Sequence, residues 1–212
     1  MEKIKKRIAN LKVAGKLKVY QMTVLVMTLF LVLVALISTL VIRSNIEKIT
    51  EVWSPSLEYL QDLETMTAKY RIKQYQHLVS SDAATMNSCE EEIQKLESQI
   101  KDTSAKLNKI IEADRKAQKG KDDYEAASSA WEGYRANSDE ILQLSRDNKQ
   151  QEAAKLMIGE VYENYTSFAD KLTKLCDRFQ VELDQAKTMA NVCTVIIFIV
   201  IVAAGLAIAV VT

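Results

Sequence analysis

The chain has 212 residues with 28 basic and 28 acidic side chains, so its formal net charge is zero. One proline and five glycines are too few for a fold rich in turns or strands, which excludes that class in favour of long helices. The three cysteines have neither the number nor the spacing of a disulfide framework, and we interpret them as small apolar fillers.

The N-terminal segment, residues 1–18, is strongly basic, with seven Lys or Arg and one Glu. Residues 43–190 are acidic, with 21 basic and 27 acidic side chains. Basic residues beside a membrane span stay in the cytoplasm, where they also contact anionic lipid head groups. We therefore expect residues 1–18 to be cytoplasmic and residues 43–190 to be extracytoplasmic. The acidic charge of the outer segment also argues against nucleic-acid binding.

Residues 19–42 and 192–211 are two uncharged apolar runs. At about 1.5 Å per helical residue, each is long enough to cross the ~30 Å hydrocarbon core of a bilayer. A buried core helix rarely runs this long without a charge, and a cleaved signal peptide ends in a small-residue site that the residues after Ile42 lack. The sequence therefore predicts two transmembrane helices in the lipid bilayer, with the C-terminal end at the inner face.

Apolar residues between the two runs recur at alternating steps of three and four, the seam of helices packed nearly parallel or antiparallel. Breaks near Ser80–Asp82, Gln118–Asp122 and Arg146–Lys149 divide the segment into helices at about 43–80, 83–118, 122–146 and 149–190. Short connections predict an all-α, antiparallel up-down four-helix bundle flanked by the two transmembrane helices. The seam contains Ile46, Ile49, Trp53, Leu57, Leu60, Tyr70 and Gln74; Ile93, Leu96, Ile100, Thr103, Leu107 and Ile110; Tyr124, Ala127, Trp131, Tyr134, Ser138, Ile141 and Ser145; Ile158, Val161, Tyr165, Phe168, Leu172, Leu175 and Phe179.

Two further expectations follow from the helical pattern. Pro55 predicts a kink near Val52–Ser54, because proline removes a helical hydrogen bond. A single long bundle has a thin core, and pairing with a second copy is the common way to stabilise it, so we expect a homodimer.

Several short motifs occur in a characteristic order between and beside the two apolar runs. They are Leu11-Lys12-Val13 with Lys16-Leu17, then Trp53-Ser54-Pro55-Ser56, Tyr70-Arg71 and Tyr75-Gln76-His77, then Trp131 with Tyr134, and finally Leu144-Ser145-Arg146 followed by Glu152-Ala153-Ala154. In this order the chain resembles the N-terminal sensory half of bacterial methyl-accepting chemotaxis proteins. The resemblance implies a ligand-sensing four-helix bundle in the bacterial inner membrane.

Members of that family continue after the second span into a HAMP relay and a cytoplasmic coiled coil, and neither occurs in these 212 residues. The sequence is therefore expected to be either a fragment or a free-standing input module. Similar bundles precede histidine kinases and cyclic-dinucleotide enzymes, so the output domain is left open. A membrane-anchored helical adaptor or structural protein is the alternative from another class. No phosphate loop, nucleophile motif or metal-ligand spacing is present, and the sequence predicts no enzyme, cofactor or metal site.

Candidate ligand-binding residues come from helical register. Counting from the turns places Arg71, Tyr134, Arg135 and Tyr162 at one height near the membrane-distal end. The chemotaxis receptors bind a ligand carboxylate through arginines of the first outer helix, which implies a role for Arg71, with neighbouring Tyr70 and Lys73 as weaker candidates. The guanidinium fork suits a carboxylate. The ligand would be an amino or organic acid, or a binding protein loaded with one.

The same residues also have plain structural interpretations. Arg71 can pair with one of Glu90–Glu92, and Tyr70, Tyr134 and Tyr162 can be core aromatics with hydroxyls at the rim. His77, the only histidine, is expected to be a surface or capping group.

Overall fold

The computed structural model describes residues 13–211, so most of the basic N-terminal segment lies outside the described residues. Every regular element in that range is helical. The chain divides into two compact units, one formed by residues 13–47 with 185–211 and the other by Lys48–Asp184.

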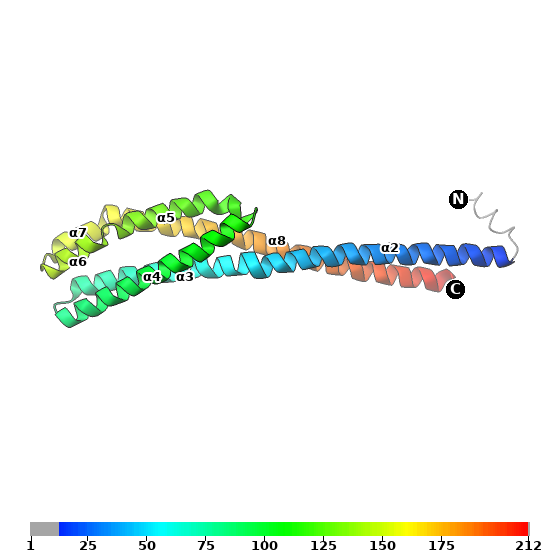
Figure 1. Ribbon diagram of the computed structural model, residues 1–212, viewed down its shortest axis with the longest axis horizontal. Helices are drawn as coiled ribbons and strands as arrows, with labels where there is room; N and C mark the ends of the chain where they lie inside the picture. The colour runs from blue at the N-terminus through cyan, green and yellow to red at the C-terminus, as the bar shows by residue number, and fades with distance from the viewer. Residues whose placement is uncertain (1–12, 212) are drawn as a thin grey trace. The chain divides into compact units, whose positions relative to one another are not determined.

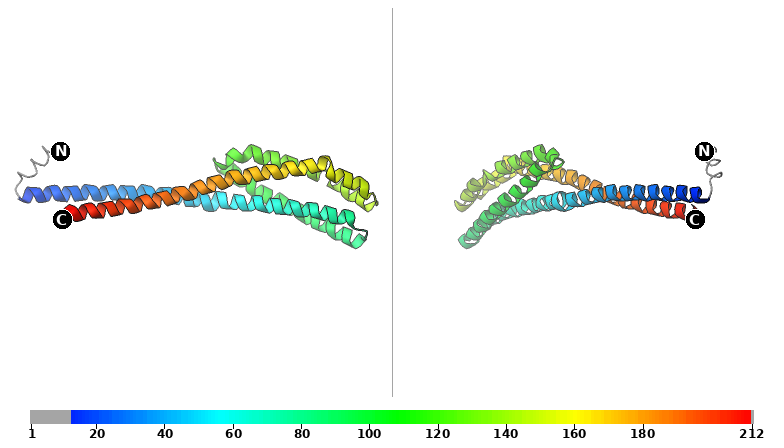
Figure 2. Two further views of the ribbon diagram at one scale, coloured as in Figure 1. Left: turned by 180° about the vertical axis from the view of Figure 1, so that it is seen from behind. Right: turned by 45° about the vertical axis from the view of Figure 1, so that its right-hand side comes forward.

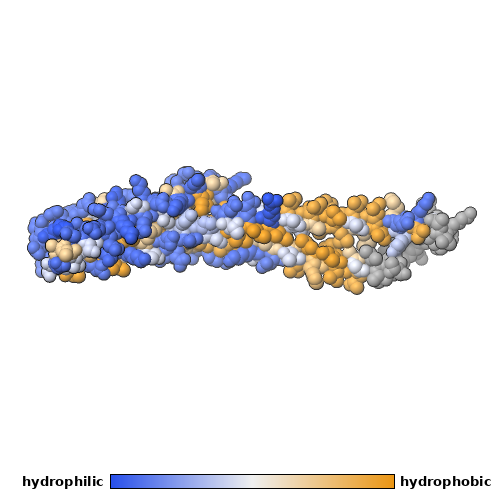
Figure 3. All heavy atoms as spheres, turned by 60° about the horizontal axis from the view of Figure 1, so that its bottom comes forward, coloured by the Kyte–Doolittle hydropathy of each residue, from blue (hydrophilic) through white to orange (hydrophobic). Residues whose placement is uncertain are grey.

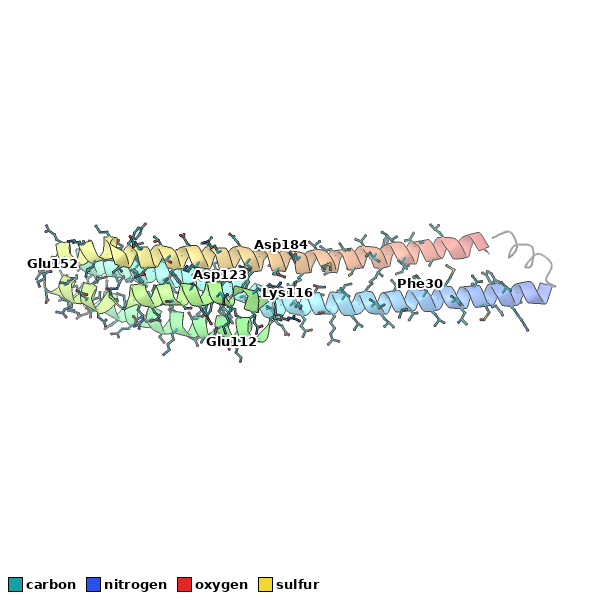
Figure 4. All side chains as sticks on the ribbon, turned by 90° about the horizontal axis from the view of Figure 1, so that it is seen from above. Phe30, Glu112, Lys116, Asp123, Glu152 and Asp184 are labelled. Atoms are coloured by element: carbon teal, nitrogen blue, oxygen red, sulfur yellow. The ribbon has the colours of Figure 1, made fainter. Side chains whose placement is uncertain are left out.

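The first unit contains two apolar helical segments. They belong to α2 (Val13–Lys48) and to the C-terminal part of α8 (Glu160–Val211), and each is long and apolar enough to cross a membrane. Figure 3 shows apolar side chains gathered over both segments, and Phe30, labelled in Figure 4, is 60 % exposed. The buried side chains described in this unit are the small residues Ser38, Ala186 and Ala204. Apolar surface left outward and small residues turned inward are typical of helices packed within lipid.

The second unit is an antiparallel helical bundle. It contains a π-helical turn, η1 (Ile49–Trp53), then α3 (Ser54–Val79), α4 (Ala83–Ala113), a 3₁₀ turn η2 (Ala117–Gly120), α5 (Lys121–Arg135), α6 (Ser138–Arg146), α7 (Gln150–Ile158) and the first part of α8. Figures 1 and 2 show α3 and α4 side by side, with α6 and α7 at the end where α3 turns into α4. The prediction of an all-α four-helix bundle is confirmed, with α5–α6 and α7–α8 as its third and fourth members.

The predicted turns are correct at two positions. Asp82 caps α4 by accepting hydrogen bonds from the amides of Ala84 and Thr85, because its carboxylate satisfies amides that the first helical turn leaves free. The turn after α6 ends with Asn148 at φ 56°, a left-handed conformation that asparagine tolerates better than most residues. Two breaks were not predicted, at Ala136–Asn137 and at Gly159, where α7 ends.

The second predicted turn lies earlier than expected, because α4 ends at Ala113 and not at residue 118. The side chain of Asp114 accepts hydrogen bonds from the amides of Lys116 and Ala117, which starts a new turn there. Lys116 and Asp123, both labelled in Figure 4, form ion pairs with Glu182 (2.6 Å) and Arg178 (2.9 Å) of α8. These contacts attach the α4–α5 connection to the last helix of the bundle.

The backbone irregularity expected from Pro55 takes the form of a π-helical turn at Ile49–Trp53. The amide of Ser54 donates to the carbonyl of Ile49, five residues earlier, so the helix is locally wider. Pro55 then falls in the first turn of α3, where a missing amide hydrogen has no cost.

The core of the bundle follows most of the predicted seam. Trp53, Leu60, Tyr70, Leu107 and Ile141 are among its fully buried side chains. The seam is wrong at three places: Ile46 and Ile158 are half or more exposed, and Ile111 is buried where Ile110 was expected. Ile46 lies near the start of the first predicted outer helix, and Ile158 is the last residue of α7, beside the unpredicted break at Gly159.

Candidate ligand-binding site

An aromatic cluster occupies the middle of the bundle. Trp131 of α5 packs against Tyr70 of α3 (5.2 Å between centroids), Tyr134 of α5 (5.4 Å) and Phe168 of α8 (5.5 Å). Tyr70 and Tyr134 are 0 % and 1 % exposed. These two tyrosines are therefore core aromatics, but their hydroxyls are buried and not at the rim, and Tyr162 lies outside the core at 43 % exposed.

The hydroxyls of the buried tyrosines belong to a polar network inside the core. Tyr70 donates to Ser138 (2.7 Å) or Glu97 (3.0 Å), Gln74 donates its amide to Ser138 (2.9 Å), and Tyr134 donates to the Gln74 carbonyl oxygen. Burial raises the pKa of Tyr70 and of Tyr134 well above their usual range, so both remain neutral donors. The network joins α3, α4, α5 and α6, and each of its buried groups depends on the others.

His77 is buried, so the prediction of a surface group is wrong. Its Nε2 donates to Glu90 Oε1 (2.9 Å), and its Nδ1 is hydrogen-bonded with the hydroxyl of Ser145 (2.9 Å). Arg146 donates to the same oxygen of Glu90 (2.6 Å) and to Asn87. The packing of α6 over α3 and α4 encloses the imidazole, and sequence spacing alone does not reveal that contact.

Glu90 gives this end of the bundle a pH-dependent stability. The hydrogen bond from Arg146 and that from His77 lower the pKa of Glu90, against the effect of burial. A carboxylate with a lowered pKa contributes stability above its unfolded pKa, and the contribution is lost as pH falls through the folded pKa. We expect the wild type to have a higher thermal midpoint than Glu90→Gln at neutral pH, and the difference to shrink as the pH is lowered below about 4.

Circular dichroism of the full chain in detergent across that pH range measures the effect. Glu91→Gln is the matched control, because Glu91 is exposed and no ion pair is described for it. A Glu90→Gln difference that stays constant with pH would contradict the assignment.

Arg71 lies among tyrosine rings on the α3–α8 side of the bundle. Its guanidinium carbon is 4.6 Å from the ring centroid of Tyr165, 4.7 Å from that of Tyr162 and 5.4 Å from that of Tyr75. Its Nη2 donates to the Tyr75 hydroxyl (3.2 Å), and its buried Nε has no hydrogen-bond partner. We call these four residues the arginine–tyrosine cluster. Such contacts stabilise a cation without neutralising it.

None of the ion pairs described for the side chains of residues 17–159 and 161–206 involves Arg71. The alternative interpretation, an ion pair with Glu90–Glu92, is therefore wrong, since Glu90 is bound by Arg146 and His77. Burial raises the pKa of Tyr165; the positive charge of Arg71 lowers it, and the negative charge of Glu64 raises it further. Glu64 is nevertheless outside ion-pair distance of Arg71. The cluster thus holds a half-buried positive charge that no ion pair among the described side chains neutralises.

The structure brings only some of the predicted site residues together. Arg71 and Tyr162 are in contact, whereas Arg135 lies in a groove between α4 and α5, where it pairs with Glu132 (3.0 Å). Lys73 is half-buried on α3. Tyr75 and Tyr165 were missed, although each lies one helical turn from a predicted residue, Arg71 or Tyr162, and therefore shares its face.

The described cysteines behave as ordinary interior or interhelical residues. Cys89 is buried in α4, and burial raises the pKa of the Cys176 thiol to about 11. A thiol held in its protonated form is a poor nucleophile.

A family model described as "Four helix bundle sensory module for signal transduction" matches residues 10–192. No curated protein matches the chain. The match covers the whole first apolar run and the bundle, and it ends at the first residue of the second run, so it agrees with the resemblance found from the short motifs. The family match identifies the chain as a sensory input module. The match and the two helices able to cross a membrane together indicate a membrane protein. The chain belongs to the family of four-helix-bundle sensory modules of methyl-accepting chemotaxis proteins.

Proposed function

We propose that the chain detects an amino or organic acid outside the bacterial inner membrane, with residues 1–18 in the cytoplasm and Arg71 as the group that binds the ligand carboxylate. One observation carries the assignment to Arg71: a half-buried guanidinium whose Nε has no hydrogen-bond partner and for which no ion pair is described among the side chains of residues 17–159 and 161–206. A buried charge without a partner is costly, and a carboxylate ligand would remove that cost with two parallel hydrogen bonds.

The tyrosines give the site its shape and its connection to a second helix. Arg71 and Tyr75 belong to α3, and Tyr162 and Tyr165 belong to α8. A ligand that contacts both helices binds some arrangements of α3 and α8 more tightly than others, and so shifts their populations. α8 is helical from Glu160 to Val211, which supports it as the element that carries a small displacement across the membrane.

A homodimer is the second part of the proposal. Exposed apolar side chains lie on α3 and on α7–α8, at the end where the arginine–tyrosine cluster is found: Ile72, Val79, Ile158 and Tyr162. Exposed apolar residues near one another favour association, and a second copy would cover them.

Isothermal titration calorimetry of the full chain in nanodiscs, against a panel of amino and organic acids, tests the ligand assignment. Arg71→Ala is expected to weaken binding of the responding acid by at least about thirtyfold, because truncating one partner of a buried charge pair has an effect of this size. Arg71→Lys should restore only part of the affinity, since lysine lacks the planar fork. Lys69→Ala, an equal charge change at an exposed position of α3, should leave affinity unchanged.

Unaltered affinity in Arg71→Ala would overturn the role of Arg71. A complete lack of small-molecule binding, together with a stable complex with a cellular protein, would overturn the sensor and favour an adaptor.

A further inference from the structure

A groove separates α4 from α5 on the side of the bundle away from the arginine–tyrosine cluster. Its volume is about 590 Å³, within the roughly 300–1,000 Å³ typical of small-molecule sites. Two interactions cross it: Tyr124 donates to the carbonyl of Ser104 (2.7 Å), and Arg135 Nη1 lies 3.9 Å from Glu97 Oε1. α4 and α5 pack less closely than α3 and α4 do, and the groove lies between them.

The floor of the groove is aromatic. Trp131, Tyr124 and Phe168 line it, and each is between 5 % and 7 % exposed. The rings of Trp131 and Phe168 are held by the core packing described above, and Tyr124 is held by its hydrogen bond to Ser104, so the floor is rigid and apolar. A flat apolar group of a ligand would be desolvated there without displacing a side chain.

The rim of the groove has charges of both signs on one helix. Glu97 and Lys101 are four residues apart on α4, so their Cβ atoms are about 5–6 Å apart. Glutamate followed by lysine at this spacing is the favourable order for an ion pair, yet the described ion pairs do not join them. Glu97 Oε1 accepts from Tyr70, whereas no partner is described for its Oε2 or for the Lys101 ammonium.

We propose that this groove is a second binding site, for a small zwitterion with an aromatic or large apolar side chain. The ligand ammonium would contact Glu97 and its carboxylate would contact Lys101, with the side chain over Trp131. In an amino acid a single carbon atom carries both the ammonium and the carboxylate. The ammonium can therefore contact Glu97 while the carboxylate contacts Lys101 on the same face of α4. Arg135 lies at the opposite rim, where it pairs with Glu132 (3.0 Å) and approaches Glu97 Oε1 (3.9 Å), so Glu97 Oε2 is the oxygen left for the ligand ammonium.

Calorimetry of the full chain in nanodiscs with three probes tests this site. The probes are L-phenylalanine, 3-phenylpropionate, which lacks the ammonium, and phenethylamine, which lacks the carboxylate. L-Phenylalanine is expected to bind at least about tenfold more tightly than either, since each charge-assisted contact contributes about a factor of ten. Glu97→Gln should reduce the affinity for L-phenylalanine to that for 3-phenylpropionate, and Lys101→Met to that for phenethylamine.

Three further variants separate this site from other causes. Lys95→Met, at an exposed position of α4 outside the groove, should leave L-phenylalanine affinity unchanged, and Arg71→Ala measures any binding at the arginine–tyrosine cluster. Ser98→Trp, at an exposed lining position, should block binding by filling the groove without altering a charge. Equal helicity by circular dichroism confirms that each variant is folded.

Absence of L-phenylalanine binding to the wild type at millimolar concentration, or binding that survives both Glu97→Gln and Lys101→Met, would overturn the groove as a site. Binding lost in Arg71→Ala and retained in the groove variants would also overturn it, and would place the ligand at the arginine–tyrosine cluster.

Discussion

Replacing Trp131 by alanine is expected to lower the free energy of unfolding by about 3–5 kcal/mol, the usual cost of truncating a buried aromatic residue. Trp131 is 6 % exposed and packs against rings from α3, α5 and α8, so its removal leaves a cavity where three helices meet. The destabilisation has two sources: the transfer free energy of the indole is lost, and Tyr70, Tyr134 and Phe168 lose their contacts with it. The thermal midpoint should fall by roughly 10 °C or more.

Thermal unfolding of the full chain in detergent, followed by circular dichroism, measures this change. Trp131→Phe is the matched control: it keeps an aromatic ring in the cluster and should lose clearly less stability than Trp131→Ala. A loss below about 1 kcal/mol in Trp131→Ala would contradict the position of Trp131 in the core, because changes of that size are typical of surface sites.

Gln74→Leu is expected to destabilise the bundle by about 2–3 kcal/mol, although the substitution places an apolar residue in an apolar interior. Gln74 is 0 % exposed; it donates to Ser138 and accepts from Tyr134. Leucine at this position leaves the Tyr134 hydroxyl buried without its acceptor, and an unsatisfied buried group costs about 1–3 kcal/mol. Burial prevents water from replacing the lost bond.

A second substitution distinguishes this explanation from simple loss of packing. In Gln74→Leu with Tyr134→Phe the unsatisfied hydroxyl is absent, so the double variant should be more stable than Gln74→Leu alone. Gln76→Leu, at an exposed position of the same helix, should change stability by less than about 0.5 kcal/mol. Additive losses in the double variant would show that the Gln74–Tyr134 hydrogen bond does not contribute as described.

The distribution of polar and apolar residues along the chain predicted the fold class. Uncharged runs at 19–42 and 192–211 and the three-four seam between them contain the information for long helices, because helical periodicity is local. The caps show both the strength and the limit of local signals. The break predicted at Ser80–Asp82 contains Asp82, which caps α4, whereas the turn at Asp114 was missed because the helix was predicted to continue to residue 118.

The candidate site depended more on tertiary structure. Helical register placed Arg71 and Tyr162 at one height, because both lie near turns from which residues can be counted. The structure shows that they are in contact. Register does not state which side of a bundle a residue faces. Arg135 was therefore grouped with Arg71 although it lines the groove between α4 and α5, and His77 was expected at the surface although α6 encloses it.

The sequence by itself determined that the chain forms long helices, where two of them can cross a lipid bilayer, and which face of each outer helix is buried. These properties depend on spacing along one helix and on the free energy of moving apolar side chains out of water. Only the tertiary structure decided that the buried Nε of Arg71 has no hydrogen-bond partner, that Gln74 joins two buried hydroxyls, and that Glu97 and Lys101 border an open groove. Each of these depends on distances between side chains of different helices, which the order of residues along one helix does not specify.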